Sequence, residues 1–424
     1  MTILRDLLRK VPFPIKFRVA KLLFRLGFPV LKRFRLLDEL ATPPETMSRL
    51  AAAKNRDIEI LVVLDRLPLP AKDAARVRML AILKILTQFA GVTLIPLYHR
   101  FANSKYENAV RELGIEIVGV FDLESALRGR HFDIALISYP HVADYMMPVI
   151  RREFPGAKAI FDTGDVQFIR LRREAEVKDS RVIGREAEKI RLIETRLANS
   201  ADQTWCVTAD DREFLLAEAT AAKIKVVPNI HAVNNRGPVF EERSGLLFIG
   251  NFEHRPNVDA IYWLLDEILP LAGDEGRKIK LHIVGGGIPP AMAGRRSENV
   301  IQHGFAENVE PFYRQCRLVV APLRFGGGMK GKIGEAMSFG VPVVTTVIGA
   351  EGFGLIDGRH ALIADDAPGF AANILRAYHN KEMWQTLSDN GLAYIDVNLS
   401  PKMAETHIRV ALDALLPGRG ISQR

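Results

Sequence analysis

The sequence predicts an α/β protein built from two domains, each with a parallel sheet covered by helices. Apolar runs typical of buried strands alternate with helix-like segments from residue 58 to residue 364. A polar stretch at residues 234–244 interrupts this alternation and reads as a linker. A length of 424 residues also favours two or more domains. We therefore expect an N-terminal domain at residues 57–232 and a C-terminal domain at residues 245–400, with ligands bound in a central cleft that faces the carboxyl ends of both sets of strands.

Each expected element follows from an apolar run or from a segment of helical periodicity. In the N-terminal domain we expect strands at 58–64, 92–97, 116–120, 134–138, 159–162, 203–207 and 225–227. Between them we expect helices at 74–89, 106–113, 123–127 and 145–154, and one long charged helix at 170–200.

The C-terminal domain repeats the pattern. We expect strands at 245–250, 279–284, 299–303, 318–321, 342–346 and 361–364, and final helices at 370–378, 381–395 and 401–415. We treat residues 401–424 as a C-terminal helix that packs back on the N-terminal domain.

The charge of the chain is concentrated at its start. Residues 1–40 carry a net charge of +7, out of +8 for the whole chain. Within residues 15–26, apolar side chains form one helical stripe and basic side chains form its neighbour, so residues 1–56 are predicted to be a basic amphipathic helical tail and a linker. An anionic membrane surface is the partner we expect for residues 1–40. A helix packed on the protein's own body, or a nucleic-acid contact, remains the alternative. We expect no nucleic-acid partner, because the rest of the chain is nearly neutral.

The cysteine content and the length of the apolar runs predict the cellular compartment. Cys206 and Cys316 are the two cysteines, which argues against a disulfide framework and for a reducing compartment. No uncharged apolar run approaches the roughly 20 residues that span a bilayer. We therefore expect a cytoplasmic protein, peripheral on the inner face of the cytoplasmic membrane.

The most informative stretch is residues 324–352. An apolar strand ends before three glycines, a helix-like segment follows at residues 330–339, and a second apolar strand follows that. Glycine lets a ligand approach the backbone, and a helix N-terminus attracts an anion. Lys330 and Lys332 add positive charge, and Glu335 lies about one turn further on. A phosphate in the loop, with a carboxylate nearby for hydroxyl groups, suggests a sugar nucleotide.

Several motifs together resemble the retaining glycosyltransferases of family 4, the group 1 transferases with the GT-B fold of two Rossmann-like domains. The matching pieces are Glu335-Ala336-Met337, residues 340–344, residues 349–352, residues 248–252, residues 255–260 and residues 283–287. Residues 161–168 resemble a segment of a bacterial branch that makes surface polysaccharides. The resemblance covers about residues 58–415.

The resemblance implies transfer of a sugar from a nucleotide-diphosphate sugar to a hydroxyl of a glycan or lipid-linked acceptor, with retention of the anomeric configuration. It implies no metal and no cofactor beyond the donor substrate. It implies that Glu335 binds the ribose hydroxyls of the donor, and it makes Lys332 the better candidate for binding the diphosphate. Lys330 and Lys332 as solvated residues, and Glu335 as a surface residue, are the alternatives. The full set of donor-binding candidates is Glu335, Lys330, Lys332, Gly326, Gly327, Gly328, Arg324, Gly250, Asn251, Arg255 and Glu351.

The chain departs from the family pattern at three places. The first of two glutamates usual in the family is replaced by Gly327, so the amides of Gly327 and Gly328 are expected to substitute. An Arg and a Lys usual in the family are replaced by Asn251 and Asn257. Diphosphate binding would then rest on Lys330 and Lys332, with Arg255 or Arg324.

The acceptor side is predicted to use aspartates. The histidine of many relatives is replaced by Asp165, which could orient the acceptor hydroxyl or take its proton, with help from Asp162. We therefore expect Asp165, Asp162 and Lys332 to be catalytic. A plain turn at Asp165, and a helix-capping role for Glu351, remain alternatives.

Two other functions fit the same sequence. A nucleotide-sugar epimerase of the same fold would need no acceptor. A catalytically inactive, membrane-associated homologue in a polysaccharide assembly would explain the departures at Gly327, Asn251 and Asn257. NAD binding by Gly285–Gly287 is not expected, because two prolines follow where the helix of a dinucleotide site would run.

Overall fold

The computed structural model describes residues 57–68, 74–97, 104–119, 127–234 and 237–421. The expected basic tail, and all but the last residue of the helix expected at 123–127, lie outside this part of the chain. The chain divides into two compact units. Unit 1 is residues 1–67 and 86–161, and unit 2 is residues 68–85 and 162–424. The domain boundaries expected from the sequence remain a prediction.

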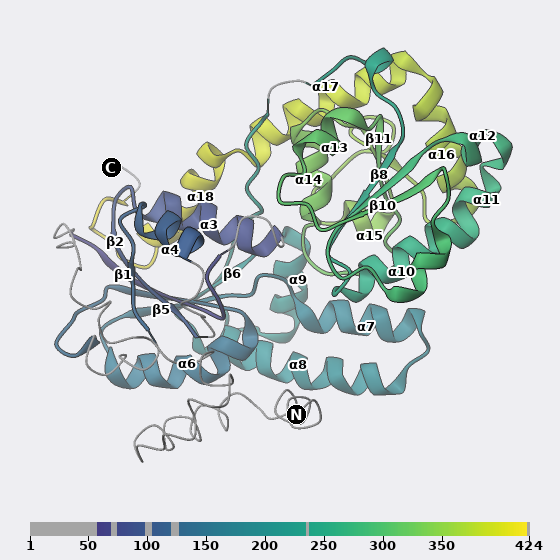
Figure 1. Cartoon of the computed structure of the whole chain (residues 1–424). Helices are drawn as coiled ribbons and strands as arrows, with labels where there is room; N and C mark the ends of the chain where they lie inside the picture. Colours follow the sequence, from purple (N-terminus) through teal and green to yellow (C-terminus); the bar gives the residue numbers. More distant parts are fainter. Residues whose placement is uncertain (1–56, 69–73, 98–103, 120–126, 235–236, 422–424) are drawn as a thin grey trace, which may run out of the picture. The chain divides into compact units, whose positions relative to one another are not determined.

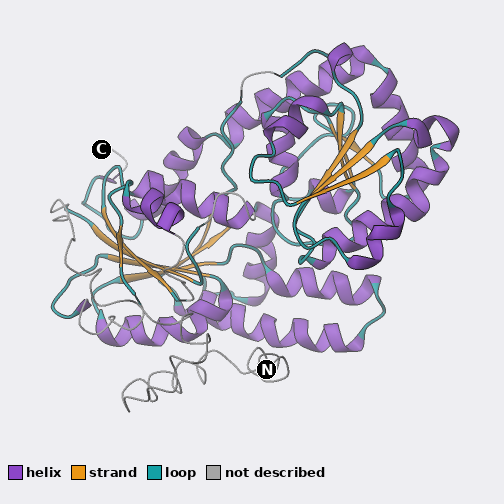
Figure 2. Cartoon of the chain, in the orientation of Figure 1, coloured by secondary structure: helices purple, strands orange, loops and turns teal. Residues whose placement is uncertain are grey.

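Two sheets are formed by the described residues (Figure 2). One has the strand order β3-β2-β1-β4-β5-β6-β7 and the other β10-β9-β8-β11-β12-β13. Strand β1 pairs in parallel with β2 and with β4, and β8 pairs in parallel with β9 and with β11. Neighbours that are not consecutive in sequence require crossover connections, and here helices make them. The predicted fold class, two parallel-sheet α/β domains, is confirmed.

The elements of unit 1 follow the predicted order. They are β1 (Glu59–Leu64), β2 (Gly91–Pro96), α4 (Ser104–Arg111), β3 (Glu116–Ile117), β4 (Ile134–Ser138), α6 (Pro140–Glu153) and β5 (Lys158–Asp162). The interior of β1 and β4 is almost wholly buried, as expected for continuous apolar runs covered on both faces.

Unit 2 opens with α3 (Ala74–Leu86), most of which belongs to it. Its next elements are α7 (Gln167–Val177), α8 (Arg181–Ser200), β6 (Gln203–Cys206), α9 (Ala209–Glu218) and β7 (Ile224–Val226). The six-stranded sheet follows, with β8 (Leu246–Ile249), α10 (Arg255–Trp263), β9 (Leu281–Val284), β10 (Val300–Gly304), α13 (Glu310–Gln315), β11 (Leu318–Ala321), α14 (Gly331–Ser338), β12 (Val343–Thr345), α15 (Val347–Ala350) and β13 (Leu362–Ile363). The last helices are α16 (Ala367–His379), α17 (Lys381–Asn398) and α18 (Pro401–Asp413).

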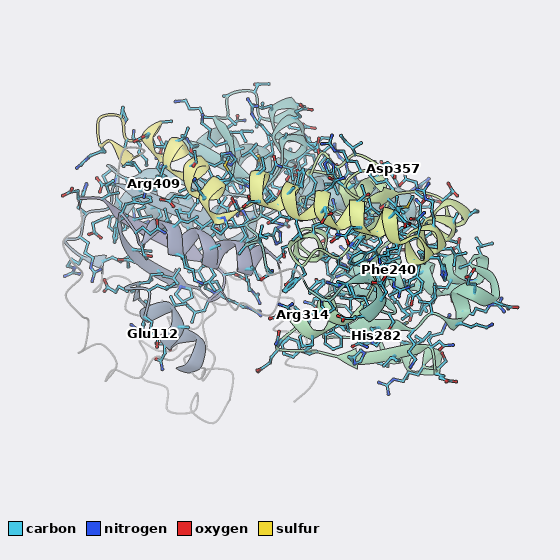
Figure 3. All side chains as sticks on the ribbon, turned by 90° about the horizontal axis from the view of Figure 1, so that it is seen from above. Glu112, Phe240, His282, Arg314, Asp357 and Arg409 are labelled. Atoms are coloured by element: carbon cyan, nitrogen blue, oxygen red, sulfur yellow. The ribbon has the colours of Figure 1, made fainter. Side chains whose placement is uncertain are left out.

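Alternate residues of β11 serve opposite faces of its sheet. Leu318 and Val320 belong to one buried cluster, with side chains of α10 and α16. Val319 and Ala321 belong to a second cluster, with side chains of α13, α14 and α17. The period of two that a strand imposes therefore fills two cores at once. Phe240, labelled in Figure 3, closes the first core by packing edge-on against Trp384 at 5.8 Å between ring centroids.

The prediction of one long helix at residues 170–200 is wrong, because the structure has two helices there, α7 and α8. Asp179 adopts a positive φ of 45°, a conformation that Asp tolerates better than most residues. Ser180 then caps α8 by accepting a hydrogen bond from the Ile183 amide at 3.4 Å. The pair Asp179-Ser180 thus reverses the chain, and α7 and α8 lie side by side (Figure 1).

No helix in the described part of the chain is long and apolar enough to cross a membrane.

Gly285 follows β9, and its backbone packs against Gly250, which follows β8, so a substitution at Gly285 tests this contact. Its φ is +147°, and a Cβ there would lie 1.8 Å from the Gly250 carbonyl oxygen. Gly285→Ala is expected to lower the free energy of unfolding by roughly 2–4 kcal/mol, because the backbone must move at the donor-side loop. Urea unfolding measures this loss. Gly294→Ala is the control, since nothing lies within 4 Å of its added Cβ. Equal stability of the two variants would contradict the packing described.

Candidate functional site

The strand order places two loops side by side in unit 2. Strand β8 continues to β9 on one side, while its neighbour β11 continues to β12 on the other. The carboxyl ends of β8 and β11 therefore mark the point where the order reverses, and open α/β sheets bind ligands there. The loop after β8 begins at Gly250, and the loop after β11 contains Gly326–Gly328 and leads into α14 (Figure 1).

The carbonyl groups of the glycine loop are held by the protein. Gly326 O accepts from Arg173 Nη1 at 3.0 Å, Gly328 O accepts from Lys330 Nζ at 2.7 Å, and Met329 O accepts from Asn229 Nδ2 at 2.9 Å. Within the described residues, no hydrogen bond is donated by the amides of Gly326–Gly328. Two of the three glycine carbonyls, and that of Met329, are thus held by the protein, whereas the three glycine N–H groups have no hydrogen-bond partner in the described residues.

Lys330 and Glu351 hold this loop in place. Lys330 is buried, and besides Gly328 O its ammonium contacts Glu351 Oε2 at 3.2 Å. Arg173 of α7 donates to both oxygens of Glu351, at 2.6 and 2.7 Å. The pKa of Glu351 is lowered overall. Burial alone would raise it, but the hydrogen bond from Arg173 and the charges of Lys330 and Arg173 together outweigh this effect. Lys330 and Glu351 therefore act on the loop from inside the protein.

Lys332 lies on the other side of the loop, near β8. Its Nζ donates to Asn257 Oδ1 at 2.6 Å, and Asn257 Nδ2 donates to the Asn251 carbonyl at 2.7 Å. A Cβ on Gly250 would lie 2.7 Å from Asn257 Nδ2 and 3.0 Å from Lys332 Nζ, so glycine makes room for this arrangement. Burial of the ammonium lowers the pKa of Lys332 to about 7. Unlike Lys330, it has no carboxylate within ion-pair distance in the described residues.

Glu335 lies one turn after Lys332 on α14. It accepts a hydrogen bond at Oε2 from the Tyr313 hydroxyl at 3.0 Å, and Tyr313 is fully buried and stacked on Phe339. Burial raises the pKa of Glu335, although the hydrogen bond from Tyr313 opposes the shift. Oε1 makes no hydrogen bond within the described residues, so one oxygen is oriented and the other is available.

The two arginines among the candidates are already paired. Arg324 donates from Nη2 and Nε to the two oxygens of Asp259, at 2.6 and 2.9 Å. Arg255 lies 3.2 Å from Glu174 Oε2 and so joins α10 to α7. Lys332 is therefore the candidate cation whose charge is not matched by a nearby carboxylate.

The backbone at Gly327 and Gly328 packs directly on the start of α7. A Cβ on Gly327 would lie 3.2 Å from Arg170 Cβ and 3.3 Å from the Val166 carbonyl. At Gly328, where φ is +57°, a Cβ would lie 3.3 Å from Asp165 Cβ. The glutamate usual in the family at position 327 would have to displace these atoms, so its absence here has a structural reason.

The two predicted catalytic aspartates have different surroundings. Asp165 is half-buried beside the glycine loop and accepts from Arg170 Nε at 3.1 Å. Asp162 is buried in an ion pair with Arg78, with Nη1 and Oδ1 2.9 Å apart. Arg78 also donates to the Val227 carbonyl from Nε and Nη2. Asp162 is thus paired with an arginine that also binds the carbonyl of the residue after β7, whereas Asp165 lies at the loop.

Asp211 was not singled out from the sequence. It is 3% exposed, its amide donates to the Thr208 hydroxyl at 2.9 Å, and Oδ2 is buried with no hydrogen bond in the described residues. Oδ2 lies 3.8 Å from where a Cβ on Gly328 would be. Burial, with a smaller contribution from the charge of Asp165, raises the pKa of Asp211 to about 7. The capping pattern Thr208-x-x-Asp211 at the start of α9 is the signal that could have located it.

His254 joins the same region at the start of α10. The residue is exposed, yet desolvation of its ring lowers its pKa, and the charges of Arg170 and Lys332 lower it further. Asp165 and Glu174 oppose this shift. In the described ranges, no group of three or more His, Cys, Asp or Glu side chains is placed to hold a metal ion.

The raised pKa of Asp211 predicts a pH-dependent stability. Between its ordinary pKa of 3.8 and the folded value of about 7, the native state keeps a proton that the unfolded state has lost. Stability therefore falls as pH rises through this window, by on the order of 2–4 kcal/mol. Asp211→Asn should abolish this component, as measured by urea unfolding from pH 4 to pH 8.

Burial also raises the pKa of Glu194, to about 8, so Glu194 makes its own contribution to the pH dependence of stability. Because Glu194 is present in both the natural chain and Asp211→Asn, the difference between their two pH curves isolates the contribution of Asp211. Asp274→Asn, on the exposed start of α12 (Gly273–Lys278), is the matched control. Parallel pH curves for the natural chain and Asp211→Asn would contradict the assignment.

Part of this chain is similar in sequence to known proteins. Residues 243–380 match the family model "Glycosyl transferases group 1". An uncharacterized 44.6 kDa protein in the cps region of Klebsiella pneumoniae is 29% identical over 166 residues, which are 37% of this chain and 43% of that protein. The match thus spans less than half of that relative's length.

Two solved structures are similar over 84% of this chain. Sucrose-phosphate synthase from Thermosynechococcus elongatus has a TM-score of 0.66 at 13% identity, with 99% of that chain covered. HepE from Anabaena, in complex with UDP and glucose, has a TM-score of 0.62 at 14% identity, with 100% covered. At these identities the likeness concerns the fold, and the family model concerns residues 243–380. Residues 243–380 of this chain are thus similar to the group 1 glycosyl transferases, and the fold of two parallel-sheet α/β domains is GT-B-like.

Proposed function

We propose that this chain transfers a sugar from a nucleoside-diphosphate sugar to a hydroxyl group of a glycan or lipid-linked acceptor, with the anomeric configuration retained and without a metal ion. The observation that carries the proposal is the glycine loop. Its carbonyls are held by Arg173, Lys330 and Asn229, its amides are available, and Lys332 and Glu335 follow on α14. HepE, which shares the fold, has been solved with UDP and glucose.

The donor diphosphate binds at the loop in this proposal. Amides of Gly326–Gly328 and the N-terminus of α14 donate to its oxygens, and Lys332 supplies the positive charge. Negative charge grows on the leaving phosphate as the glycosidic bond breaks, so donors fixed in advance stabilise the transition state more than the ground state. Lys330, Glu351 and Arg173 contribute by holding the loop, and they do not touch the donor.

Glu335 takes the nucleoside ribose. A ribose offers adjacent hydroxyl donors, and an oriented carboxylate oxygen accepts from them well. Tyr313 holds Oε2, which leaves Oε1 for this role. Because burial raises the pKa of Glu335, binding of hydroxyl donors also helps to keep the carboxylate ionised.

Asp165 serves the acceptor. It lies against Gly328, beside the loop that holds the diphosphate in this proposal, and its partner Arg170 keeps the carboxylate oriented. A carboxylate there can accept the proton of the attacking hydroxyl or orient it. Asp162, held in its ion pair with Arg78, supports the position of this segment.

The setting that we propose is polysaccharide biosynthesis for the cell envelope, at the inner face of the cytoplasmic membrane. The relative encoded in a cps region supports this setting. The basic sequence of residues 1–40 would provide membrane contact, and it lies outside the described residues.

Lys332 makes the donor proposal testable by proton linkage. At pH 8 its ammonium is mostly deprotonated in the free protein, since burial lowers its pKa to about 7. A bound diphosphate favours the charged form, so UDP binding should take up close to one proton per site. Titration calorimetry in two buffers with different ionisation enthalpies measures that proton number.

Lys332→Met should bind UDP at least about tenfold more weakly and with little proton uptake, while its fold stays intact. Lys278→Met, on exposed α12, is the matched control and should behave as the natural chain. Natural uptake by the Lys332→Met variant would remove Lys332 from the diphosphate site.

Variants of Asp165 and Asp162 should distinguish a catalytic role from a structural role. Asp165→Asn is expected to lower turnover by roughly 10²-fold or more with donor binding and fold retained, because a general base is lost. Asp162→Asn is expected to destabilise unit 2 by about 3–5 kcal/mol, because it leaves Arg78 buried without its charge partner. Sugar-transfer assays and urea unfolding on both variants decide between these roles. Full activity of Asp165→Asn would exclude it as the base.

A further inference from the structure

The helix α8 presents one face that is both basic and apolar. Within residues 181–196, six exposed side chains fall on one stripe of the helix, since their positions at 100° per residue lie within about 100° of one another. We call this stripe the α8 face, and it consists of Arg181, Val182, Arg185, Lys189, Leu192 and Arg196. Val182 is 75% exposed and Leu192 is 58% exposed. Among the described residues, Val182 is the most exposed large aliphatic side chain.

The opposite side of α8 explains why this face is outward. Ala187, Leu197 and Ala198 are buried, together with Glu194, whose carboxylate accepts from the amides of Gln167 and Phe168 at the start of α7. Helix α7 therefore covers one side of α8, as seen in Figure 1. The apolar stripe that normally faces a core is satisfied there, so Val182 and Leu192 are additional to it.

Three basic side chains of the α8 face have no ion-pair partner among the described residues. Arg181, Arg185 and Lys189 make no hydrogen bond or ion pair with any described residue. The neighbouring acidic residue Glu188 is instead taken by Arg191, whose Nε lies 2.9 Å from Oε2, and by Arg172 at 3.8 Å. The face therefore keeps a concentrated positive charge beside two exposed aliphatic side chains.

Its spacing fits a flat surface better than a groove or a nucleic acid. Val182 and Leu192 are ten residues apart, about 15 Å along the helix, with basic residues between and beside them. A protein groove that receives a helix requires apolar anchors at i, i+3, i+4 and i+7, and this face has two apolar side chains. Nucleic acid would match the charge but leave both aliphatic side chains without a partner. A lipid interface matches both kinds of side chain. Anionic headgroups attract the basic side chains, and the aliphatic side chains insert at the boundary between headgroups and acyl chains.

We propose that the α8 face rests on a membrane surface that contains anionic phospholipids. This inference rests on the membrane setting of the proposed function and adds a second surface to it, and none of the residues of that surface belongs to the donor or acceptor site. Its residues belong to unit 2. It would hold the α7–α8 pair, and with it Arg173 and the glycine loop, at a fixed height above the lipid.

A reporter at a single position tests the proposal in the full chain. Val182→Cys carries one exposed thiol, because the native Cys206 and Cys316 are fully buried and burial raises both thiol pKa values, that of Cys316 to about 12. The new thiol is labelled with an environment-sensitive nitrobenzoxadiazole dye. Vesicles of equal parts phosphatidylglycerol and phosphatidylcholine should raise its emission severalfold and shift it to the blue, whereas pure phosphatidylcholine should not.

Two matched variants make the result specific. Val397→Cys on α17 is 64% exposed but follows Asp396 and lies on no basic stripe, so its label should not respond. Adding Arg181→Glu, Arg185→Glu and Lys189→Glu to Val182→Cys should abolish the response of the label even when residues 1–40 bring the protein to the vesicles. UDP binding by this variant should be unchanged, which separates failure of this inference from failure of the proposed function.

Three outcomes of the experiments with vesicles would overturn the proposal. They are an unchanged label at position 182 when the protein sediments with anionic vesicles, an equal response at position 397, and a response that persists in the triple variant. A response that depends on protein concentration without vesicles would instead identify a second copy of the chain as the occupant, and would also overturn it.

Discussion

The organisation of unit 2 depends on one charged contact, the Glu351 carboxylate between Arg173 and Lys330. It joins three segments that are far apart in sequence: α7, the glycine loop and the residue that ends α15. Arg173 and Lys330 use their remaining donors on the carbonyls of Gly326 and Gly328. A pair of this kind is costly to bury, and satisfaction of nearly every donor is what makes it favourable. The same contact fixes the direction of the loop amides.

This arrangement also explains the departure from the family pattern at Gly327. The loop backbone approaches Arg170 and Val166 so closely that a side chain at this position would require these neighbours to move. The loop therefore offers backbone N–H groups where relatives offer a carboxylate. The change at Asn257 is compensated differently, since its amide occupies the space left open by Gly250 and orients the Lys332 ammonium.

Much of the fold could be predicted from the sequence, because parallel strands buried on both faces leave unmistakable apolar runs, as in residues 318–321. The glycine loop and α14 were predicted from the three glycines and the helix-like segment after them, and the similarity to the group 1 transferases from the motifs around Glu335. The break between α7 and α8 was missed, because Asp179 and Ser180 lie in a strongly charged segment whose helical periodicity hardly changes. The inward direction of Lys330 could not be predicted, since its partner Glu351 is 21 residues away and is shared with Arg173, which is 157 residues away. Asp211 was missed because burial, which gives it its properties, is set by the tertiary structure.

The last helix has a consequence for how the polypeptide is made. Gln203 of β6 donates its side-chain amide to the Ala411 carbonyl of α18, at 3.1 Å and in a buried position. That bond joins a strand to a helix synthesised some two hundred residues later. On the ribosome, β6 must wait for α18 before this amide has its native partner, so the early part of unit 2 completes its packing only when residue 411 has emerged.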